Sequence, residues 1–383
     1  MEAADGLLVR LRLPGGSIAP AGLRTVADVA EQFGNGVVEM TSRANVQIRG
    51  LQIGTIDEVA ELLAIGGLVG PDAARDERRD VVVSPLTGHD PNQFIDLTST
   101  ALAAADLLTT APDLECLPPK FGVVFDDGGT APVREVPGDL CFGAVPSAQS
   151  EPSMQLELGR ALNDADPTVA CIPATEALRV MIAGAGLCSS HGARLSELVE
   201  RQGRPAVVAA VTDGVSVSWE HDPSPSATVH PVGMLAHHRG DRVNLGAAPL
   251  LGRASPTMLC ALADLADASS ACVRLTPWRG IVFLGVATSD AELVLDGLAS
   301  AGFSTDPSDP AHLVSACAGS PGCQASRADT MGAALALLDG PMAPTRRVHL
   351  SGCEKRCGAN TNFVLVADER GSFDFDSFVP EQS

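Results

Sequence analysis

Basic residues are scarce in this chain of 383 residues. Lysine and arginine together number 26, against 47 aspartates and glutamates, which gives a formal net charge of −21 at pH 7. This balance argues against a nucleic-acid partner, because phosphate binding needs a basic face. Only Lys120 and Lys355 are lysines, and a residue used so rarely is expected to stand where its charge is needed.

The chain also lacks the hydrophobic segments that membranes and export require. No apolar run reaches the length of a transmembrane helix, and the N-terminus M-E-A-A-D-G-L-L-V-R has neither the basic region nor the apolar core of a signal peptide. We therefore expect a cytoplasmic protein with no membrane partner and with its ten cysteines reduced. Hydrophobic residues make up 45%, enough for the cores of two or three domains.

Four cysteines near the C-terminus form two close pairs, Cys317-x5-Cys323 and Cys353-x3-Cys357. Four thiolates can surround one metal centre, and the neighbouring glycines and proline would let backbone N–H groups turn toward sulfur. This pattern favours a [4Fe–4S] cluster. A structural zinc site with the same ligands is the alternative, although zinc ribbons favour C-x2-C pairs. The other six cysteines are expected to be small buried hydrophobic residues: Cys116, Cys141, Cys171, Cys188, Cys260 and Cys272.

The sequence contains an internal repeat. Its first copy predicts, in order, strand 7–13, helix 21–33, strand 37–41, strand 46–51 and helix 55–65. Its second copy predicts strand 242–246, helix 255–267, strand 272–276, strand 281–286 and helix 289–300. Each copy has the order β-α-β-β-α of a ferredoxin-like half. A unit of this size buries little surface alone, so we expect the two to lie side by side about a pseudo-two-fold axis and to share one sheet.

Two further segments alternate with the repeats. One contains helix 92–110, strand 121–126 and helix 174–184, and the other contains the cysteines, helix 329–338 and strand 362–367. The sequence therefore predicts an α+β protein in which two ferredoxin-like half-units with pseudo-two-fold symmetry alternate with two α/β domains. The predicted divisions are half-unit 1 at 5–68, α/β domain 1 at 75–225, half-unit 2 at 230–302, and the cysteine-bearing iron–sulfur α/β domain at 305–383.

A polar strand face stands out in the first repeat. Alternation places Arg43, Asn45, Gln47 and Arg49 on one side of the chain. Two guanidiniums and two carboxamides on one face are costly unless they are solvated or bound, and arginine suits bidentate pairing with carboxylates. A solvent-facing strand is the alternative interpretation of this segment taken by itself.

Three other elements carry a cation beside a predicted strand. Arg79 lies in D-E-R-R-D-V, Lys120 lies in L-P-P-K-F-G, and Arg279 lies in R-L-T-P-W-R. A cation beside a tryptophan at a strand junction suits a large flat anionic ligand. Each element alone is weak evidence for a site that binds such a ligand. All of them in this order, together with the four cysteines, are stronger evidence.

Together these elements resemble the sulfite/nitrite reductase superfamily, whose members hold a [4Fe–4S] cluster beside a reduced tetrapyrrole with many carboxylates. The family pattern T-[ST]-R-x-x-x-Q is matched by Thr41, Ser42, Arg43 and Gln47, and the element L-P-x-K-F is matched by Leu117, Pro118, Lys120 and Phe121. The element R-N-V is matched by Arg79 and Val81, with Asp80 in place of asparagine. The cluster ligands are matched by Cys317, Cys323, Cys353 and Cys357.

The chain departs from the reductases of this superfamily at Gly122, where they carry a second lysine at the substrate oxyanion. Loss of that lysine removes a proton source and a positive charge that reduction of sulfite or nitrite requires. The segments T-P-W-R at 276–279 and S-G-C-x-K at 351–355 instead resemble the precorrin-3B synthases. That resemblance implies oxygen-dependent hydroxylation and γ-lactone formation on precorrin-3A in cobalamin biosynthesis.

The same resemblance implies the cofactors and the site. It implies a [4Fe–4S] cluster, a mononuclear non-haem iron, dioxygen as co-substrate and an electron donor whose identity the sequence does not give. The residues expected to bind the carboxylates of the tetrapyrrole are Arg43, Arg79, Lys120, Gln47 and Arg279. No spacing of histidines and carboxylates typical of a non-haem iron site stands out.

Two other functions remain open from the sequence. A sirohaem-dependent sulfite or nitrite reductase would keep the cluster and bind sirohaem in the same place. A non-enzymatic Fe–S redox sensor or tetrapyrrole carrier would keep the cluster and the basic pocket but show no turnover with dioxygen.

Overall fold

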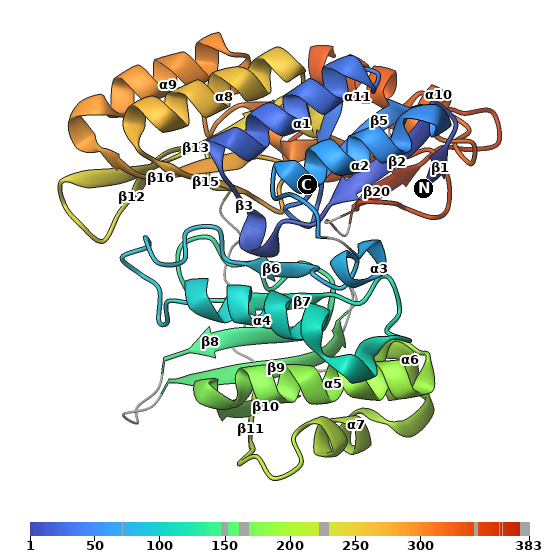
Figure 1. Ribbon diagram of the computed structural model, residues 1–383, viewed down its shortest axis with the longest axis vertical. Coiled ribbons are helices and arrows are strands. Elements are labelled where there is room, and N and C mark those ends of the chain that lie inside the picture. Colours follow the sequence, from blue (N-terminus) through green and yellow to red (C-terminus); the bar gives the residue numbers. More distant parts are fainter. Residues whose placement is uncertain are drawn as a thin grey trace, which may run out of the picture.

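The structure is a computed structural model, which describes residues 1–70, 72–146, 152–160, 168–221, 230–340, 344–359, 361 and 363–375. In Figure 1 the two repeats and the C-terminal region form the upper part, and the α/β segment between the repeats forms the lower part. This is the predicted α+β fold, with two ferredoxin-like half-units alternating with two α/β regions. No described helix has both the length and the apolar composition needed to cross a membrane.

Half-unit 1 is built as the repeat predicts. Its elements are β1 (Glu2–Ala3), β2 (Gly6–Leu11), β3 (Ser17–Ile18), α1 (Pro20–Gln32), β4 (Val38–Met40), β5 (Val46–Leu51) and α2 (Ile56–Ile65). α1 begins at Pro20, whose fixed φ suits the first helical position. Its buried face carries Leu23, Val26, Val29 and Ala30, a spacing that fits one side of an α-helix against the sheet.

Half-unit 2 repeats this order with different residues. Its elements are β12 (Gly233–Ala236), β13 (Arg242–Pro249), β14 (Arg253–Ala254), α8 (Pro256–Ser269), β15 (Cys272–Leu275), β16 (Ile281–Ala287), α9 (Ala291–Ser300) and β17 (Phe303–Ser304). α8 also begins at a proline, and the hydroxyl of Ser255 caps it by accepting from Met258 N at 3.2 Å.

The two half-units share a core and not a sheet, so the expectation of one common sheet was wrong. The strand orders are β1-β2-β5-β4-β14 and β12-β13-β16-β15-β3, so each sheet is completed by a two-residue strand from the other repeat. One continuous hydrophobic cluster contains the buried residues of both. α1 packs beside α8, where Arg24 contacts Asp264 at 2.7 Å and Asp267 at 2.8 Å (Figure 1).

The strand exchange depends on a sharp turn before each short strand. In half-unit 1 the turn η1 (Pro14–Gly16) has φ 62° at Gly15 and 72° at Gly16, and in half-unit 2 the turn η5 (Leu250–Gly252) has φ 53° at Leu251 and 74° at Gly252. A side chain at Gly16 would lie 2.5 Å from the carbonyl oxygen of Leu275, so glycine is needed where the chain crosses to the other repeat.

α/β domain 1 contains a six-stranded sheet of order β11-β10-β9-β8-β7-β6, parallel from β6 to β8 and antiparallel from β8 to β11. Its strands are β6 (Val81–Val83), β7 (Val123–Asp126), β8 (Gly138–Val145), β9 (Ser153–Arg160), β10 (Thr168–Pro173) and β11 (Ser218–His221), and its helices are α3 (Ala73–Asp76), α4 (Thr98–Thr110), α5 (Ala177–His191), α6 (Leu195–Gln202) and α7 (Arg204–Val211). α4 begins later than the predicted residue 92, because Asp96 accepts from Thr98 N and ends the preceding turn.

The two faces of this sheet have different partners. Helices α4 and α5 lie on one face with the larger apolar cluster of the domain. On the other face Val82, Val124 and Cys141 pack against Trp278 and Val282 of half-unit 2. The domain is therefore joined to half-unit 2 by an apolar contact.

The C-terminal region holds a small parallel sheet of order β18-β19-β20. Its elements are β18 (Val314–Ala316), α10 (Gly319–Gly322), α11 (Thr330–Asp339), β19 (Val348–Ser351) and β20 (Val364–Val366). Residue 362 of the predicted strand 362–367 lies outside the described residues. The four-part division of the chain stays a proposal. The predicted junction between α/β domain 1, which ends at 225, and half-unit 2, which begins at 230, also lies outside the described residues.

The six cysteines outside the two pairs are not all buried. Cys141, Cys171 and Cys188 are buried, Cys260 is partly exposed, and Cys116 and Cys272 are exposed. The prediction was wrong for the last two, because one follows a 3-10 turn and the other is the first residue of β15.

Three histidines meet where α/β domain 1 touches half-unit 2. His237 accepts from Arg239 N through Nδ1 at 2.9 Å, so its Nε2 carries the proton that it donates to His89 Nδ1 at 3.1 Å. The His238 ring stacks on His237 with centroids 4.2 Å apart. Burial, and then the charge of Arg274, lowers the pKa of His89 to about 4.

We expect this cluster to make folding sensitive to mild acid. Between pH 6.5 and about 4 the unfolded chain binds a proton at His89 that the folded chain excludes, so stability is lost as the pH falls through this window. The loss is roughly 1–2 kcal/mol after allowing for solvent screening of a half-buried ring. Urea unfolding of wild type and His89→Gln at several pH values measures it. His191→Gln, which changes an exposed histidine, is the control. If the free energy of unfolding of His89→Gln falls with pH as that of the wild type does, the prediction is contradicted.

Candidate functional site

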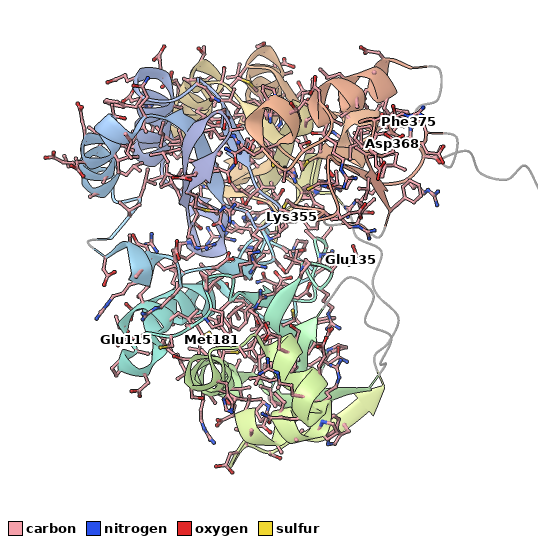
Figure 2. The ribbon with its side chains drawn as sticks, turned by 90° about the vertical axis from the view of Figure 1, so that its right-hand side faces the viewer. Glu115, Glu135, Met181, Lys355, Asp368 and Phe375 are labelled. Atoms are coloured by element: carbon pink, nitrogen blue, oxygen red, sulfur yellow. The ribbon has the colours of Figure 1, made fainter. Side chains whose placement is uncertain are left out.

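A cavity of about 670 Å³ lies where half-unit 1, α/β domain 1 and the cysteine region meet. Among the described residues, cations dominate its lining: Arg10, Arg12, Arg43, Arg49, Lys120, Arg194, Arg253, Arg279 and Lys355, against Glu2, Glu39 and Asp80. Figure 2 shows Lys355 at the junction between the cysteine region and the domain below it. The acidic chain thus encloses a basic cavity, which suits an anionic ligand because nearby cations act within the Debye length.

The predicted polar strand face lines this cavity. β5 directs Gln47 and Arg49 into it, while Val46 and Ile48 are in the core. Opposite them on β2, Arg10 donates from Nη2 to Gln47 Oε1 at 3.1 Å. The sequence analysis missed Arg10 and its neighbour Arg12, although the alternation V-R-L-R-L in a predicted strand places both on one face.

A tight turn presents Arg43 and Asn45. Asn45 N donates to Thr41 Oγ1 at 3.1 Å, and Ala44 adopts φ 54°. Arg43 Nε donates to Asp80 Oδ2 at 2.6 Å, and its Nη1 donates to the carbonyl of Pro137. Arg12 Nη1 reaches the same Asp80 oxygen at 3.2 Å. Asp80, which replaces the asparagine of the family pattern, therefore fixes two arginines at the cavity wall.

Gly122 leaves the space that the Arg43 guanidinium occupies. A Cβ atom at residue 122 would collide with Arg43 Nη2 and lie 2.7 Å from its Cζ. Gly122 itself is held by Asp139, which accepts from its N–H at 3.1 Å. Gly122 and the Arg43 guanidinium are therefore in close contact at the cavity wall.

Arg79 is not among the residues that line the cavity, and its assignment to the carboxylate-binding set stays a prediction. Its Nη2 donates to Leu68 O at 3.0 Å and its Nε lies 3.3 Å from Asp76 Oδ1. In this extended segment successive side chains point to opposite sides, and Asp80 is the one that faces the cavity.

Arg279 reaches the cavity from half-unit 2 through a turn that repeats the one at Thr41. Thr276 N donates to Gly280 O at 2.9 Å, and Arg279, at the position of Ala44, adopts φ 61°. Its Nη2 donates to Gly358 O at 3.0 Å. Burial lowers the pKa of Arg279, although neighbouring Glu39 opposes this effect. The two repeats therefore direct a cation each to one site.

Arg49 serves mainly to join the parts of the site. It donates to Asp5 through Nε and Nη2, both at 2.9 Å, and Nη2 also donates to Gly322 O at 2.5 Å. Arg49 Nη1 also lies 3.6 Å from Glu39 Oε2, so the guanidinium of Arg49 is engaged by other groups of the protein. Arg49 thus ties half-unit 1 to the loop that carries Cys323.

The four paired cysteines lie at or beside the same cavity. Cys317 follows β18, Cys323 follows α10, and Cys353 and Cys357 follow β19, so adjacent parallel strands deliver both pairs at one edge. Three of the four line the cavity. The pKa of Cys357 is raised by burial and then by the other three thiols, while Lys120 opposes the shift. Gly352 N donates to Cys317 Sγ at 3.4 Å, as expected for glycines beside such sulfurs.

This donor set fits a cluster held by four thiolates, and the cavity beside it is open to a second group. Among the described residues, no three His, Cys, Asp or Glu side chains are placed to hold a single metal ion, and the four paired cysteines are included in that statement.

Comparison with known proteins agrees with this arrangement. The nitrite/sulfite reductase ferredoxin-like half-domain family matches residues 1–64 and 236–301. A precorrin-3B synthase from Sinorhizobium sp is 30% identical over 93% of this chain and 76% of its own length. A ferredoxin sulfite reductase from Mycolicibacterium paratuberculosis is 28% identical over 94% of this chain and 68% of its own. The structure of Mycobacterium tuberculosis NirA has the same fold, with a TM-score of 0.75 at 23% identity over 92% of this chain and 68% of its own.

The half-domain match falls on the two repeats, and the relatives span nearly all of the chain. Their names are those of oxidoreductases, and this chain is accordingly an enzyme of that class. It belongs to the sulfite/nitrite reductase superfamily.

Proposed function

We propose that the chain is a precorrin-3B synthase, which hydroxylates precorrin-3A with dioxygen and closes a γ-lactone in cobalamin biosynthesis. The observation that carries the proposal is the contact between Gly122 and Arg43. Gly122 has no side chain at the position where the reductases are expected to carry a second lysine, and it packs against the Arg43 guanidinium, which Asp80 and Pro137 hold at the cavity wall. The relative of that name at 30% identity supports the same conclusion.

The cavity suits a macrocycle with many carboxylate arms. Its volume of about 670 Å³ is within the range of ligand sites, and its cations come from all the surrounding units. Lys120 and Lys355 form no hydrogen bond or ion pair with any described residue, so both have donors to offer. With them we propose Arg43, Gln47 and Arg279 as carboxylate-binding residues.

We propose that Cys317, Cys323, Cys353 and Cys357 hold a [4Fe–4S] cluster at the wall of this cavity. When bound, the cluster supplies electrons for the oxygen-dependent reaction. The protein's own contribution is to orient the substrate: cations beside acetate arms keep those arms ionised, and an ionised ring A acetate is the form that closes the lactone. The described residues do not define a site for the mononuclear iron, and no step is assigned to it.

The decisive assay incubates the reconstituted protein with precorrin-3A, a reductant and labelled dioxygen, and follows the mass of the product. Incorporation of one labelled oxygen, with no appreciable reduction of sulfite or nitrite, is the expected result. Binding of precorrin-3A without turnover would favour the redox-sensor or carrier alternative.

The reductase relatives favour one other candidate, a sirohaem-dependent sulfite or nitrite reductase. It predicts sirohaem retained through purification, with strong Soret absorption. Six-electron reduction of sulfite by a reduced viologen would establish it in place of the synthase.

Lys120 gives the cleanest test of substrate binding, because its loss breaks no contact within the described protein. Lys120→Met is expected to raise the dissociation constant for precorrin-3A about tenfold or more, since a charge-assisted hydrogen bond is worth roughly 1.5–3 kcal/mol. Fluorescence titration measures it while the cluster absorption serves as a check on integrity. Arg201→Met, on the exposed face of α6, is the control and should bind as wild type. Equal affinity of all three proteins would remove the support for this site.

A further inference from the structure

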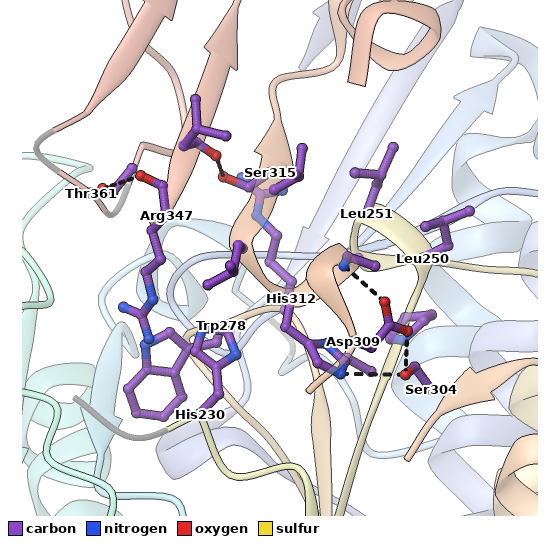
Figure 3. Close-up of a pocket in the computed structure, with 18 of the residues that line it drawn as sticks. His230, Leu250, Leu251, Trp278, Ser304, Asp309, His312, Ser315, Arg347 and Thr361 are labelled. Carbon is purple, nitrogen blue, oxygen red and sulfur yellow. Dashed lines mark hydrogen bonds between the residues drawn. The ribbon is translucent and has the colours of Figure 1, made fainter. Parts of the chain in front are cut away.

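A second cavity of about 220 Å³ lies between half-unit 2 and the cysteine region (Figure 3). Half-unit 2 contributes the turn η5 and Trp278 to its lining, and the cysteine region contributes the segment 309–315, Arg347 and Thr361. Of the described residues, it shares only Leu251 and Arg279 with the large cavity. It is therefore a separate chamber that adjoins the first one.

The chamber contains cationic nitrogen atoms that lack partners. Arg347 Nη2 and Arg279 Nε are both buried, and neither has a hydrogen-bond partner among the described residues. The nearest carboxylate recorded for Arg347 is Glu135 Oε2, 3.9 Å from Nη1 and on a half-exposed side chain. Buried charges in proteins are normally paired, because an uncompensated one is costly.

The chamber's own carboxylate does not supply that pairing. Asp309 accepts from Ser304 Oγ at 2.6 Å through Oδ2 and from Ala311 N at 2.8 Å through Oδ1. Figure 3 shows this group on the side of the chamber away from Arg347. His230 adds no negative charge, and its pKa is lowered to about 3 by burial and then by Arg347. The part of the chamber near Arg347 is positive and has room for an anion.

Apolar side chains line other parts of the chamber. The Arg347 guanidinium lies over the Trp278 ring, 5.9 Å from its centroid, and Leu313 and Val314 also line the chamber. A guanidinium favours a planar carboxylate, and the apolar surface favours a short carbon body. The volume limits the ligand to a small molecule or to one arm of a larger one.

We propose that this chamber binds a small organic carboxylate, with its carboxyl group on Arg347 and its carbon body against Trp278. The proposal does not depend on the reaction assigned to the large cavity. The carboxylate has two sources with the same chemistry: a free small acid, or a carboxylate arm of a macrocycle that passes Leu251 and Arg279 from the large cavity.

Benzoate and its uncharged analogue benzamide test the site by isothermal titration of the full-length protein. Benzoate should bind, benzamide should bind at least tenfold more weakly, and Arg347→Met should weaken benzoate about tenfold or more. Arg370→Met, which removes an exposed arginine of the same region, is the matched control and should leave binding unchanged. No binding of benzoate, or equal binding by Arg347→Met, would overturn the proposal.

A second measurement uses the wild-type protein, in case Arg347→Met does not fold. In crystals soaked with 4-bromobenzoate, the anomalous signal of bromine should lie in the chamber beside Trp278, and bromine found only in the large cavity would contradict the site. Competition with uroporphyrin III separates the two sources. Displacement of benzoate assigns the carboxylate to an arm of the macrocycle, and simultaneous binding assigns it to a free acid.

Discussion

Replacement of Cys353 by serine is expected to remove the iron–sulfur cluster and most of the soluble protein. All four paired cysteines converge at one edge of the β18-β19-β20 sheet, and Cys353 and Cys357 lie on the single loop after β19. A serine hydroxyl is a poor ligand for iron compared with a thiolate, so loss of one of four ligands should release the cluster. Iron and sulfide analysis after anaerobic purification, with the visible absorption spectrum, measures the effect.

Cys116→Ser is the matched control for this experiment. It makes the same chemical change at an exposed cysteine outside the two pairs, and it should leave iron, sulfide and absorption unchanged. If Cys116→Ser loses as much iron as Cys353→Ser, the ligand assignment is wrong. Zinc in place of iron in the wild-type protein would establish the structural zinc alternative.

Introduction of the reductase lysine at Gly122 is expected to damage the site and not to convert it. A Cβ atom there collides with Arg43 Nη2, so Gly122→Lys is expected to displace Arg43 from Asp80. Because this breaks a charge-assisted contact at the wall of the cavity, affinity for precorrin-3A should fall about tenfold or more, with no sulfite reduction gained. Binding titration and a viologen-linked sulfite assay measure the two parts of this prediction.

Two other variants make the result interpretable. Gly122→Ala has the steric conflict without the charge and should lose affinity in the same direction. Gly54→Lys adds the same side chain at an exposed position with open space around it and should behave as wild type. If Gly122→Lys binds precorrin-3A normally and reduces sulfite, Gly122 does not set the chemistry and the reductase alternative gains support.

The sequence alone predicted the parts of the molecule that depend on local patterns. The period of the apolar residues located the helices and strands of both repeats close to their observed bounds, because burial of one face of an element imposes a regular spacing. The alternation in the strand after Arg43 likewise indicated the polar face that lines the cavity. The metal centre indicated by the spacing of the paired cysteines stays a prediction. These signals lie within short stretches of chain, so neighbouring residues are enough to show them.

The composition of the cavity was only partly predictable. Lys120, Gln47 and Arg279 line it as expected, but Arg79 turns away to Asp76 and Asp80 takes its place. The choice between adjacent residues of an extended segment depends on which side of it is packed. A sequence without its partners does not show that side.

Only the tertiary structure decided how distant segments meet. The exchange of β3 and β14 between the two sheets, the fit of Arg43 against Gly122, and the separate chamber at Arg347 each join residues far apart in the chain. No local pattern encodes such contacts, because they depend on the shape of the space left when several elements pack together. The sequence therefore determined which chemical groups the protein has available, and the packing of the repeats decided which of them share a site.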